Sequence, residues 1–286
     1  LITDAMIDNI YLGDMPALST VDPASKKIYV SRMNMPGMGM SSASNIIHGV
    51  SYSSGSLELV DEINICPDCD DGIGPHGITL NLSMDQLYIT SVLSDFLFKV
   101  DLPSGNIVNQ TSLNGDEGAV PNSTIQRMKP IQCSVSDEFI FVSCSSGDWV
   151  NGDEVIPGQI HMFNAETLEL IDTYDGFSGD SRPWHIVSDS YNSKIYIALS
   201  GDMMMPMGQG AACFTYDSDG LNLLWHLEDF DGMDDPHGVA VSGDGNKVYV
   251  SDRGNGHLFI FDSQSTELLN ELNLSISDYG SSTTLG

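Results

Sequence analysis

Residues 235–252 read DPHGVAVSGDGNKVYVSD, and residues 256–262 follow as GHLFIFD. A proline opens the first stretch, apolar and polar residues alternate up to a Gly-Asp-Gly turn, and a second alternating run ends in Tyr-Val. Tight turns between runs of period two are typical of antiparallel hairpins. These residues therefore predict three consecutive strands of one antiparallel sheet.

The same unit occurs four more times upstream. An aromatic residue in its second strand recurs every 53 to 59 residues, at Tyr29, Tyr88, Phe141, Tyr196 and Tyr249. A proline precedes each aromatic by 11 to 13 residues, at Pro16, Pro75, Pro130, Pro183 and Pro236. A period of about fifty residues with four short strands per unit predicts an all-β fold, a β-propeller of four-stranded blades. For the unit that begins at Pro75 we expect strands over 77–82, 86–91, 96–101 and 106–112.

The segment 236–252, with its Pro-His-Gly-Val-Ala-Val start and its Lys-Val-Tyr-Val-Ser-Asp end, resembles the YVTN β-propeller repeat. The other four units carry the same pattern with varying fidelity, so the resemblance covers nearly the whole chain. It implies the propeller fold. It implies no single activity, because that family includes binding proteins, subunits of cofactor enzymes and lactonase-like relatives, and a fold does not dictate function.

The repeat also predicts the domain organisation. Residues 1–286 are expected to form a single propeller domain, in which residues 1–15 are an outer strand of a preceding blade and five complete blades begin near 16, 75, 130, 183 and 236. Methionine-rich insertions occur in blades one and four, and Pro-His-Gly occurs in blades two and five. Features repeating three blades apart favour a ring of six, with five or seven as the alternatives. A sixth blade supplied by another chain would make the protein an oligomer.

Composition limits the partners. Ten Lys and Arg face forty Asp and Glu, which gives a formal net charge of −30. This excess argues against nucleic acid and against anionic membranes, since phosphate binding needs a basic surface. It is compatible with a solvated acidic surface or with attraction of cations.

No apolar run approaches the roughly 20 residues of a membrane span. No signal peptide is visible, and Leu1 resembles a mature or trimmed start; family habit and acidity predict a secreted or periplasmic protein.

Methionines concentrate in two insertions between the second and third strands of their blades. The eight residues are Met33, Met35, Met38 and Met40 in blade one, and Met203, Met204, Met205 and Met207 in blade four. Their spacing, broken by Gly and Pro, has no strand or helix period that would explain them as core. Thioether, thiolate and imidazole groups suit copper, particularly Cu(I). Flexible methionines also form adaptable protein-binding surfaces or simply fill space.

Histidines add to this pattern. His76 and His237 occupy the same repeat position at the start of an inner strand, and His48 follows the first methionine insertion, so we predict these three as metal ligands beside the methionines. A structural histidine bonded to a neighbouring loop is the alternative for each. His185 lies one residue later in its repeat, beside Trp184, and strand alternation predicts that its side chain points the opposite way. His161, His226 and His257 lie on or beside strands and are expected to be structural.

Five cysteines are an odd number. Cys66 and Cys69 form a Cys-Pro-Asp-Cys element that lacks a second Cys-x-x-Cys, so a closed zinc site is not expected. A local disulfide, metal ligation and free thiols remain open for this pair. Cys133 and Cys144 flank one hairpin, but connectivity cannot be read from sequence.

Carboxylates cluster before three of the inner strands. They are Asp68, Asp70 and Asp71; Asp175 and Asp180; and Asp229, Asp231, Asp234 and Asp235. Such clusters suit calcium, although Asp-Gly loops are also ordinary turns and no segment has the EF-hand spacing. Catalytic motifs are missing from the sequence: it has no Gly-x-Ser-x-Gly elbow, no phosphate loop and no His-Glu-x-x-His.

These patterns together favour binding over catalysis. We expect an extracytoplasmic propeller that binds copper on a loop-rich face, in metal storage, delivery or as accessory to a redox partner. The first alternative is a scaffold without metal, whose methionine loops dock a protein or an apolar ligand. The second is a metal-dependent hydrolase of the lactonase type that uses the acidic loops.

Overall fold

The computed structural model describes residues 8–13, 15–33, 44–69, 72–115, 119–121, 128–146, 156–201 and 207–274. Twenty β-strands lie within these ranges, and they form five antiparallel sheets of four strands each. These ranges contain no helix, and so none that is long and apolar enough to cross a membrane. The fold is therefore all-β, with the four-stranded sheets of a β-propeller as its blades.

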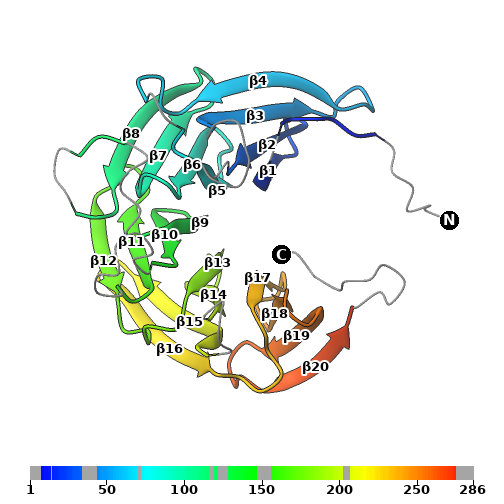
Figure 1. Ribbon diagram of the computed structural model, residues 1–286, viewed down its shortest axis with the longest axis vertical. Helices are drawn as coiled ribbons and strands as arrows, with labels where there is room; N and C mark the ends of the chain where they lie inside the picture. Colours follow the sequence, from blue (N-terminus) through cyan, green and yellow to red (C-terminus); the bar gives the residue numbers. More distant parts are fainter. Residues whose placement is uncertain are drawn as a thin grey trace. The chain divides into compact units, whose positions relative to one another are not determined.

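The chain divides into two compact units, residues 1–126 and 127–286. The first unit contains two blades, β1–β4 and β5–β8, and the second contains three, β9–β12, β13–β16 and β17–β20 (Figure 1). Strands of the first unit are β1 Pro16–Asp22, β2 Lys27–Arg32, β3 Ile46–Ser51, β4 Glu58–Asn64, β5 Pro75–Leu80, β6 Gln86–Ser91, β7 Phe96–Asp101 and β8 Asn106–Ser112. Strands of the second are β9 Pro130–Ser136, β10 Phe139–Cys144, β11 Gln159–Asn164, β12 Leu170–Tyr174, β13 Pro183–Asp189, β14 Lys194–Ser200, β15 Gln209–Asp217, β16 Gly220–Glu228, β17 Pro236–Val241, β18 Lys247–Asp252, β19 His257–Asp262 and β20 Leu268–Asn273.

Every blade runs in sequence order from an inner strand that begins at the leading proline to an outer fourth strand. Proline suits a strand start because it has no backbone N–H to contribute to the ladder. Asx turns close the last hairpin of several blades: the Asp262 carboxylate, for example, accepts the backbone N–H groups of Gln264 and Ser265 at 3.0 and 2.7 Å.

The strands predicted for blade two compare closely with the observed ones. β6, β7 and β8 have the expected bounds, which confirms those three predictions. The inner strand spans 75–80 rather than 77–82, so that prediction was two residues late. Residues 8–13 form no strand and residues 1–7 lie outside the described part, so the predicted outer strand at the N-terminus stays a prediction. The size of a closed ring also stays a prediction.

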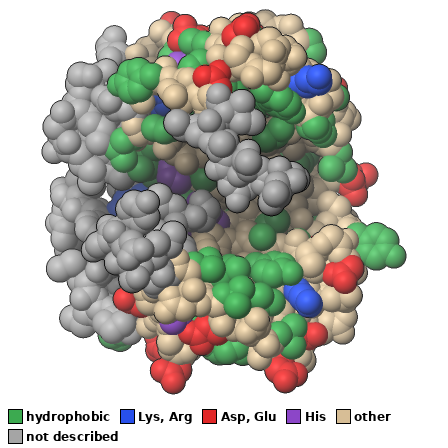
Figure 2. All heavy atoms as spheres, turned by 90° about the vertical axis from the view of Figure 1, so that its right-hand side faces the viewer, with side chains coloured by type: hydrophobic (Ala, Val, Ile, Leu, Met, Phe, Trp, Pro, Cys, Tyr) green, Lys and Arg blue, Asp and Glu red, His purple; other side chains and the backbone are tan. Residues whose placement is uncertain are grey.

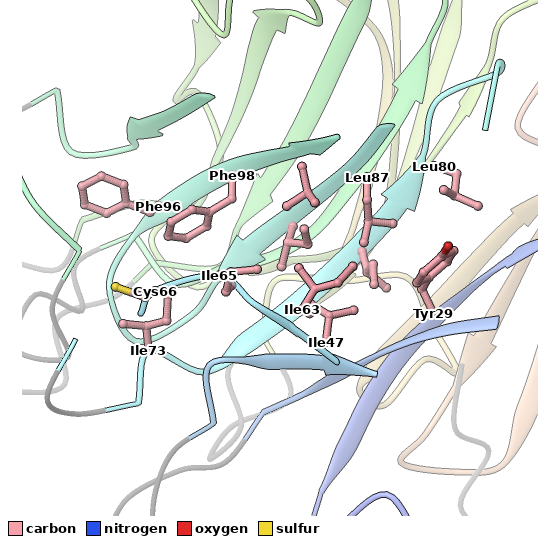
Figure 3. Packing of buried hydrophobic residues seen from close by; sticks show 13 residues of the cluster. Tyr29, Ile47, Ile63, Ile65, Cys66, Ile73, Leu80, Leu87, Phe96 and Phe98 are labelled. Atoms are coloured by element: carbon pink, nitrogen blue, oxygen red, sulfur yellow. The ribbon is translucent and has the colours of Figure 1, made fainter. Parts of the chain in front are cut away.

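Apolar side chains from facing blades fill the space between sheets. In the first unit, Tyr29, Ile47 and Ile63 of one blade pack in one cluster with Leu87 and Phe98 of the next (Figure 3). Among the described residues of the second unit two such clusters occur, one around Phe141, Ile160 and Phe214 and the other around Tyr196, Val250 and Phe259. The repeat aromatics Tyr88, Phe141 and Tyr196 are at most 1% exposed. Period-two alternation thus gives neighbouring blades within each unit apolar faces that pack against each other.

Candidate functional site

Three ring side chains meet at the start of two neighbouring inner strands in the second unit. Trp184 and His185 are the second and third residues of β13, and His237 is the second residue of β17. The His237 ring lies 5.2 Å from the Trp184 ring and 4.7 Å from the His185 ring, measured between centroids. The His185 and His237 rings are in edge-to-face contact at 73°. We call these three residues the ring cluster.

A β-bulge explains how two consecutive residues reach the same neighbour. Pro183 pairs with Leu199 and Ile186 pairs with Ile197, so the inner strand has one residue more than its partner between these pairs. A bulge breaks strict alternation and re-aims the side chains next to it. His185 was expected to point away from its repeat neighbours, yet both it and Trp184 contact His237. Alternation alone was the wrong guide here.

The same irregularity follows the leading proline in all five blades. In blades one, two, three and five a hydroxyl residue stands two positions after the repeat aromatic; these residues are Ser31, Thr90, Ser143 and Ser251. Thr90 and Ser251 accept the bulge N–H groups of Gly77 and Gly238 at 2.9 and 3.1 Å. The bulge is therefore a satisfied, repeated feature of the fold.

Some of these hydroxyls also connect one blade to the next. Ser31 Oγ donates to the carbonyl oxygen of His76 at 2.5 Å in the first unit. In the second unit Ser143 Oγ donates to the carbonyl of Trp184 and lies 3.4 Å from the carbonyl of Gln132. Ser143 thus brings the backbones of Gln132, on β9, and Trp184, on β13, to the same hydroxyl group.

Three polar atoms on or next to the inner strands of blades three, four and five are buried without a hydrogen-bond partner among the described residues. They are the indole Nε1 of Trp184, the amide Oε1 of Gln132 and the carboxylate Oδ1 of Asp235. Buried polar atoms are normally bonded to protein or water, and an unpaired one costs about 1–3 kcal/mol. One donor and two acceptors in this part of the fold are therefore left without a protein partner.

An ion pair fixes the segment that leads into His237. Arg253 contacts Asp235 Oδ2 through Nε at 2.7 Å and through a terminal guanidinium nitrogen at 2.5 Å. Burial raises the pKa of Asp235 above its ordinary value, and the Arg253 contact opposes this shift. The neighbouring Asp252 is fully buried and accepts the N–H of Asp234 at 2.5 Å; burial raises its pKa as well.

The predicted histidine ligands lie on three different strands. His48, on β3, is 5% exposed and lies 3.5 Å from Glu62; burial and the Arg32 charge lower its pKa. His76, on β5, is buried and held through its carbonyl, whereas His237 belongs to the ring cluster in the other unit. Within the described ranges no three His, Cys, Asp or Glu side chains are grouped as a metal site.

Two methionines of the insertions are described. Met33 directly follows β2 and is half-buried, and Met207 precedes β15 and is 45% exposed. Met35, Met38, Met40, Met203, Met204 and Met205 lie outside the described residues. Both insertions do connect the second and third strands of their blades. Copper ligation by these residues stays a prediction.

The cysteine question is answered for all five residues. Cys66 and Cys69 form a disulfide, one of the three states left open by the sequence. Cys133, Cys144 and Cys213 are buried thiols outside any disulfide. Burial raises the pKa of Cys133 and Cys213, the latter to about 12, so both are neutral at ordinary pH.

The structural histidines were predicted correctly in position. His161 lies on β11, stacks on Phe163 at 6.0 Å, and has its pKa lowered to about 4 by burial. His226 is on β16, and His257 opens β19 with Nδ1 2.5 Å from Glu271. Gln132 and Arg253 were missed as neighbours of the site. Nothing in their local sequence marks them, because their role comes from contacts between blades or across a turn.

Comparisons with known proteins agree on the architecture. A family model described as NHL repeat matches residues 233–261. No curated protein matches significantly. Solved structures with the same fold include Kuenenia stuttgartiensis hydrazine synthase (13% identity, TM-score 0.62, covering 86% of this chain and 64% of that one). The Pseudomonas aeruginosa periplasmic gluconolactonase PpgL has 16% identity and a TM-score of 0.63, over 91% of this chain and 70% of that one. A putative 6-phosphogluconolactonase from Bacteroides fragilis has 15% identity and a TM-score of 0.61, over 90% and 68%.

At these identities the similarity concerns the fold. The chain spans less than two thirds of the hydrazine synthase chain and about 70% of the other two. The protein belongs to the class of repeat β-propellers. Three observations define this class: the repeated four-stranded sheets, the match to the NHL repeat model and the solved structures with the same fold.

Proposed function

We propose that the protein is an extracytoplasmic propeller that binds a small hydroxyl-bearing lactone at the ring cluster and hydrolyses it. The observation that carries the proposal is the convergence of Trp184, His185 and His237 at the bulged starts of two adjacent inner strands. The proposal keeps the lactonase reaction of the second sequence-based alternative but departs from it in two respects: it assigns the reaction to the ring cluster instead of the acidic loops, and it requires no metal.

The ring cluster has the groups that bind a polar ring. An indole face offers apolar contact area to the C–H side of a sugar-like ligand, while the unpaired atoms of Trp184, Gln132 and Asp235 can bond hydroxyl groups. Ligand sites typically combine aromatic walls with a few placed polar groups. The cluster supplies both kinds of group.

His237 is the residue proposed as general base. Its side chain is partly exposed, whereas His185 is 7% exposed and packs edge-to-face against it. A neutral imidazole takes a proton from water as the water oxygen attacks the lactone carbonyl. The ring C–O bond then breaks, and the proton passes to the departing alkoxide, giving the open hydroxy acid. His185 acts as a positioning residue for His237.

Two fold neighbours support this choice of reaction, since one is named a gluconolactonase and another a putative 6-phosphogluconolactonase. Extracytoplasmic placement is supported by the Cys66–Cys69 disulfide, because disulfides persist mainly in oxidising compartments. The word periplasmic in the name of the first neighbour agrees with this placement. Membership of the YVTN repeat type stays part of the proposal.

The test is hydrolysis of glucono-1,5-lactone by the purified chain. The rate of acid release is measured and compared with the rate of spontaneous hydrolysis. His237→Gln is expected to lower kcat by about 10²–10⁴-fold, as loss of a general base does. Trp184→Leu is expected to raise KM more than it lowers kcat. His257→Gln, which changes a histidine that opens β19 and is paired with Glu271, is the matched control. If His237→Gln keeps the wild-type turnover, as His257→Gln is expected to do, His237 is not the general base.

Copper binding by the methionine insertions is the second candidate, favoured by the exposed thioether of Met207 at the end of its loop. An exposed thioether is a soft ligand that suits Cu(I). We expect a Cu(I) chelator competition to detect metal that is lost in a Met204→Leu/Met205→Leu/Met207→Leu variant and retained in Met233→Leu, whose methionine is buried. Equal Cu(I) uptake by both variants would rule out the insertion as the site and leave a protein-docking role for it.

A further inference from the structure

We infer that the ring-cluster site selects uncharged lactones and rejects their phosphorylated counterparts. The inference rests on the proposed function and names its substrate class. It matters because the two named lactonases among the fold neighbours differ in this respect, one being called a gluconolactonase and the other a putative 6-phosphogluconolactonase.

The described part of the second unit is strongly acidic as a whole. In the described residues of the second unit, twenty Asp and Glu accompany five Lys and Arg. On the face shown in Figure 2, acidic side chains are dispersed and basic ones are few. A phosphate group carries about −1.5 to −2 charges near pH 7 and is repelled by such a field.

Acidic side chains also outnumber basic ones in the turn before His237. Asp234, Asp235 and Asp252 surround the turn that leads into His237, and the backbone N–H of Asp234 bonds to the Asp252 carboxylate. Arg253 is the cation in contact with this turn, and two of its nitrogens bind Asp235 Oδ2. A guanidinium group already paired in this way is a weak phosphate ligand, since a phosphate would have to displace the carboxylate.

Arg182 is the residue that could reverse this preference. It precedes Trp184 by two residues, and its carbonyl accepts the Ser200 N–H at 2.9 Å, which fixes its backbone. If its guanidinium bound a phosphate, the phosphorylated lactone would be the better substrate. Arg182→Gln therefore belongs in the test.

The experiment compares kcat/KM for glucono-1,5-lactone and its 6-phosphate at low and moderate salt. We expect the neutral lactone to be favoured by at least tenfold at low salt, and the gap to narrow with salt because screening weakens the repulsion. Asp235→Asn leaves Arg253 unpaired and is expected to improve the phosphorylated substrate severalfold. Asp219→Asn makes an equal charge change at an exposed turn and is the control. It should leave the ratio of kcat/KM for the two substrates unchanged at both salt concentrations.

Binding of glucose and of glucose 6-phosphate can be measured by Trp fluorescence. This measurement tests, without turnover, whether the site prefers the uncharged ligand to the phosphorylated one. Two pairs are compared: the lactone with its 6-phosphate, and glucose with glucose 6-phosphate. If the phosphorylated member of either pair is preferred and Arg182→Gln abolishes this preference, the inference that the site selects uncharged ligands is wrong, whereas the proposed function still holds. Absence of both turnover and binding with every ligand would overturn the proposed function and this inference with it.

Discussion

The hydroxyl group of Ser143 donates a hydrogen bond to the carbonyl oxygen of Trp184, so a side chain of blade three holds the backbone of blade four at the residue that opens the candidate site. Because a bulge lacks the regular ladder bonds at this point, such a side-chain contact supplies the missing restraint. Site geometry and blade packing are thus coupled through one hydroxyl.

Ser143→Ala removes this restraint. We expect a loss of about 1 kcal/mol in the free energy of unfolding, the usual contribution of one hydrogen bond, together with weaker lactone binding and a shifted Trp fluorescence maximum. Ser134→Ala is the matched control, because Ser134, on β9, bonds Ser188, on β13, at 2.9 Å between the same two blades but away from the ring cluster. Urea unfolding should show similar losses for both variants. Equal effects on ligand binding would contradict a specific role of Ser143, and Ser143→Thr should restore both properties.

Blade four has Ala198 where four other blades have a hydroxyl residue. We expect Ala198→Ser to raise the free energy of unfolding by about 0.5–1 kcal/mol, since the added hydroxyl stands where its counterparts bond a bulge. Thermal and urea unfolding would measure the change. A loss of 1 kcal/mol or more would indicate that the added hydroxyl finds no partner beside the fully buried Ala198 side chain.

His161 makes stability depend on pH. Burial lowers its folded pKa to about 4 from 6.5, so the unfolded chain binds more protons and stability falls as pH decreases from about 6.5 towards 4. The loss attributable to His161 is on the order of 2–3 kcal/mol. His161→Leu should remove that part of the slope in a series of urea titrations. Asp235 and Asp252 have raised pKa values and act in the opposite sense, so the comparison must be made against wild type at each pH.

The Cys66–Cys69 disulfide closes a short loop before β5. We expect Cys66→Ser/Cys69→Ser to lower the stability of the first unit by about 2 kcal/mol or less, the chain-entropy value for so small a loop. Thiol titration in denaturant should count three thiols before reduction and five after it. Five thiols before reduction, in protein purified without reductant, would contradict the disulfide.

Much of the fold could be predicted from sequence because strand starts and turns are marked by residue type. β6, β7 and β8 were located correctly since Gly105 and the neighbouring turn residues bound alternating runs. The start of β5 was missed because the bulge after Pro75 interrupts the alternation, which resumes only at Ile78.

The site was less predictable. His237 was singled out by its repeat position, but His185 was not assigned to the site because strand alternation predicted that its side chain points the opposite way, and Trp184 was noted only as a residue of the same entry segment. Asp235 was noted only as one of several acidic residues, and its pairing with Arg253 spans a hairpin. The Met-rich insertions gave the strongest compositional signal, and their chemistry is still to be measured.

The bulge behind each leading proline has a further consequence for how such proteins diversify. The residue that follows the proline is Ala17, His76, Ile131, Trp184 or His237, yet strand pairing beyond the bulge is the same in every blade. Substitution at this position therefore leaves the register of the sheet untouched. Duplicated blades can acquire new ligand chemistry one residue at a time, while the repeat that specifies folding is inherited unchanged.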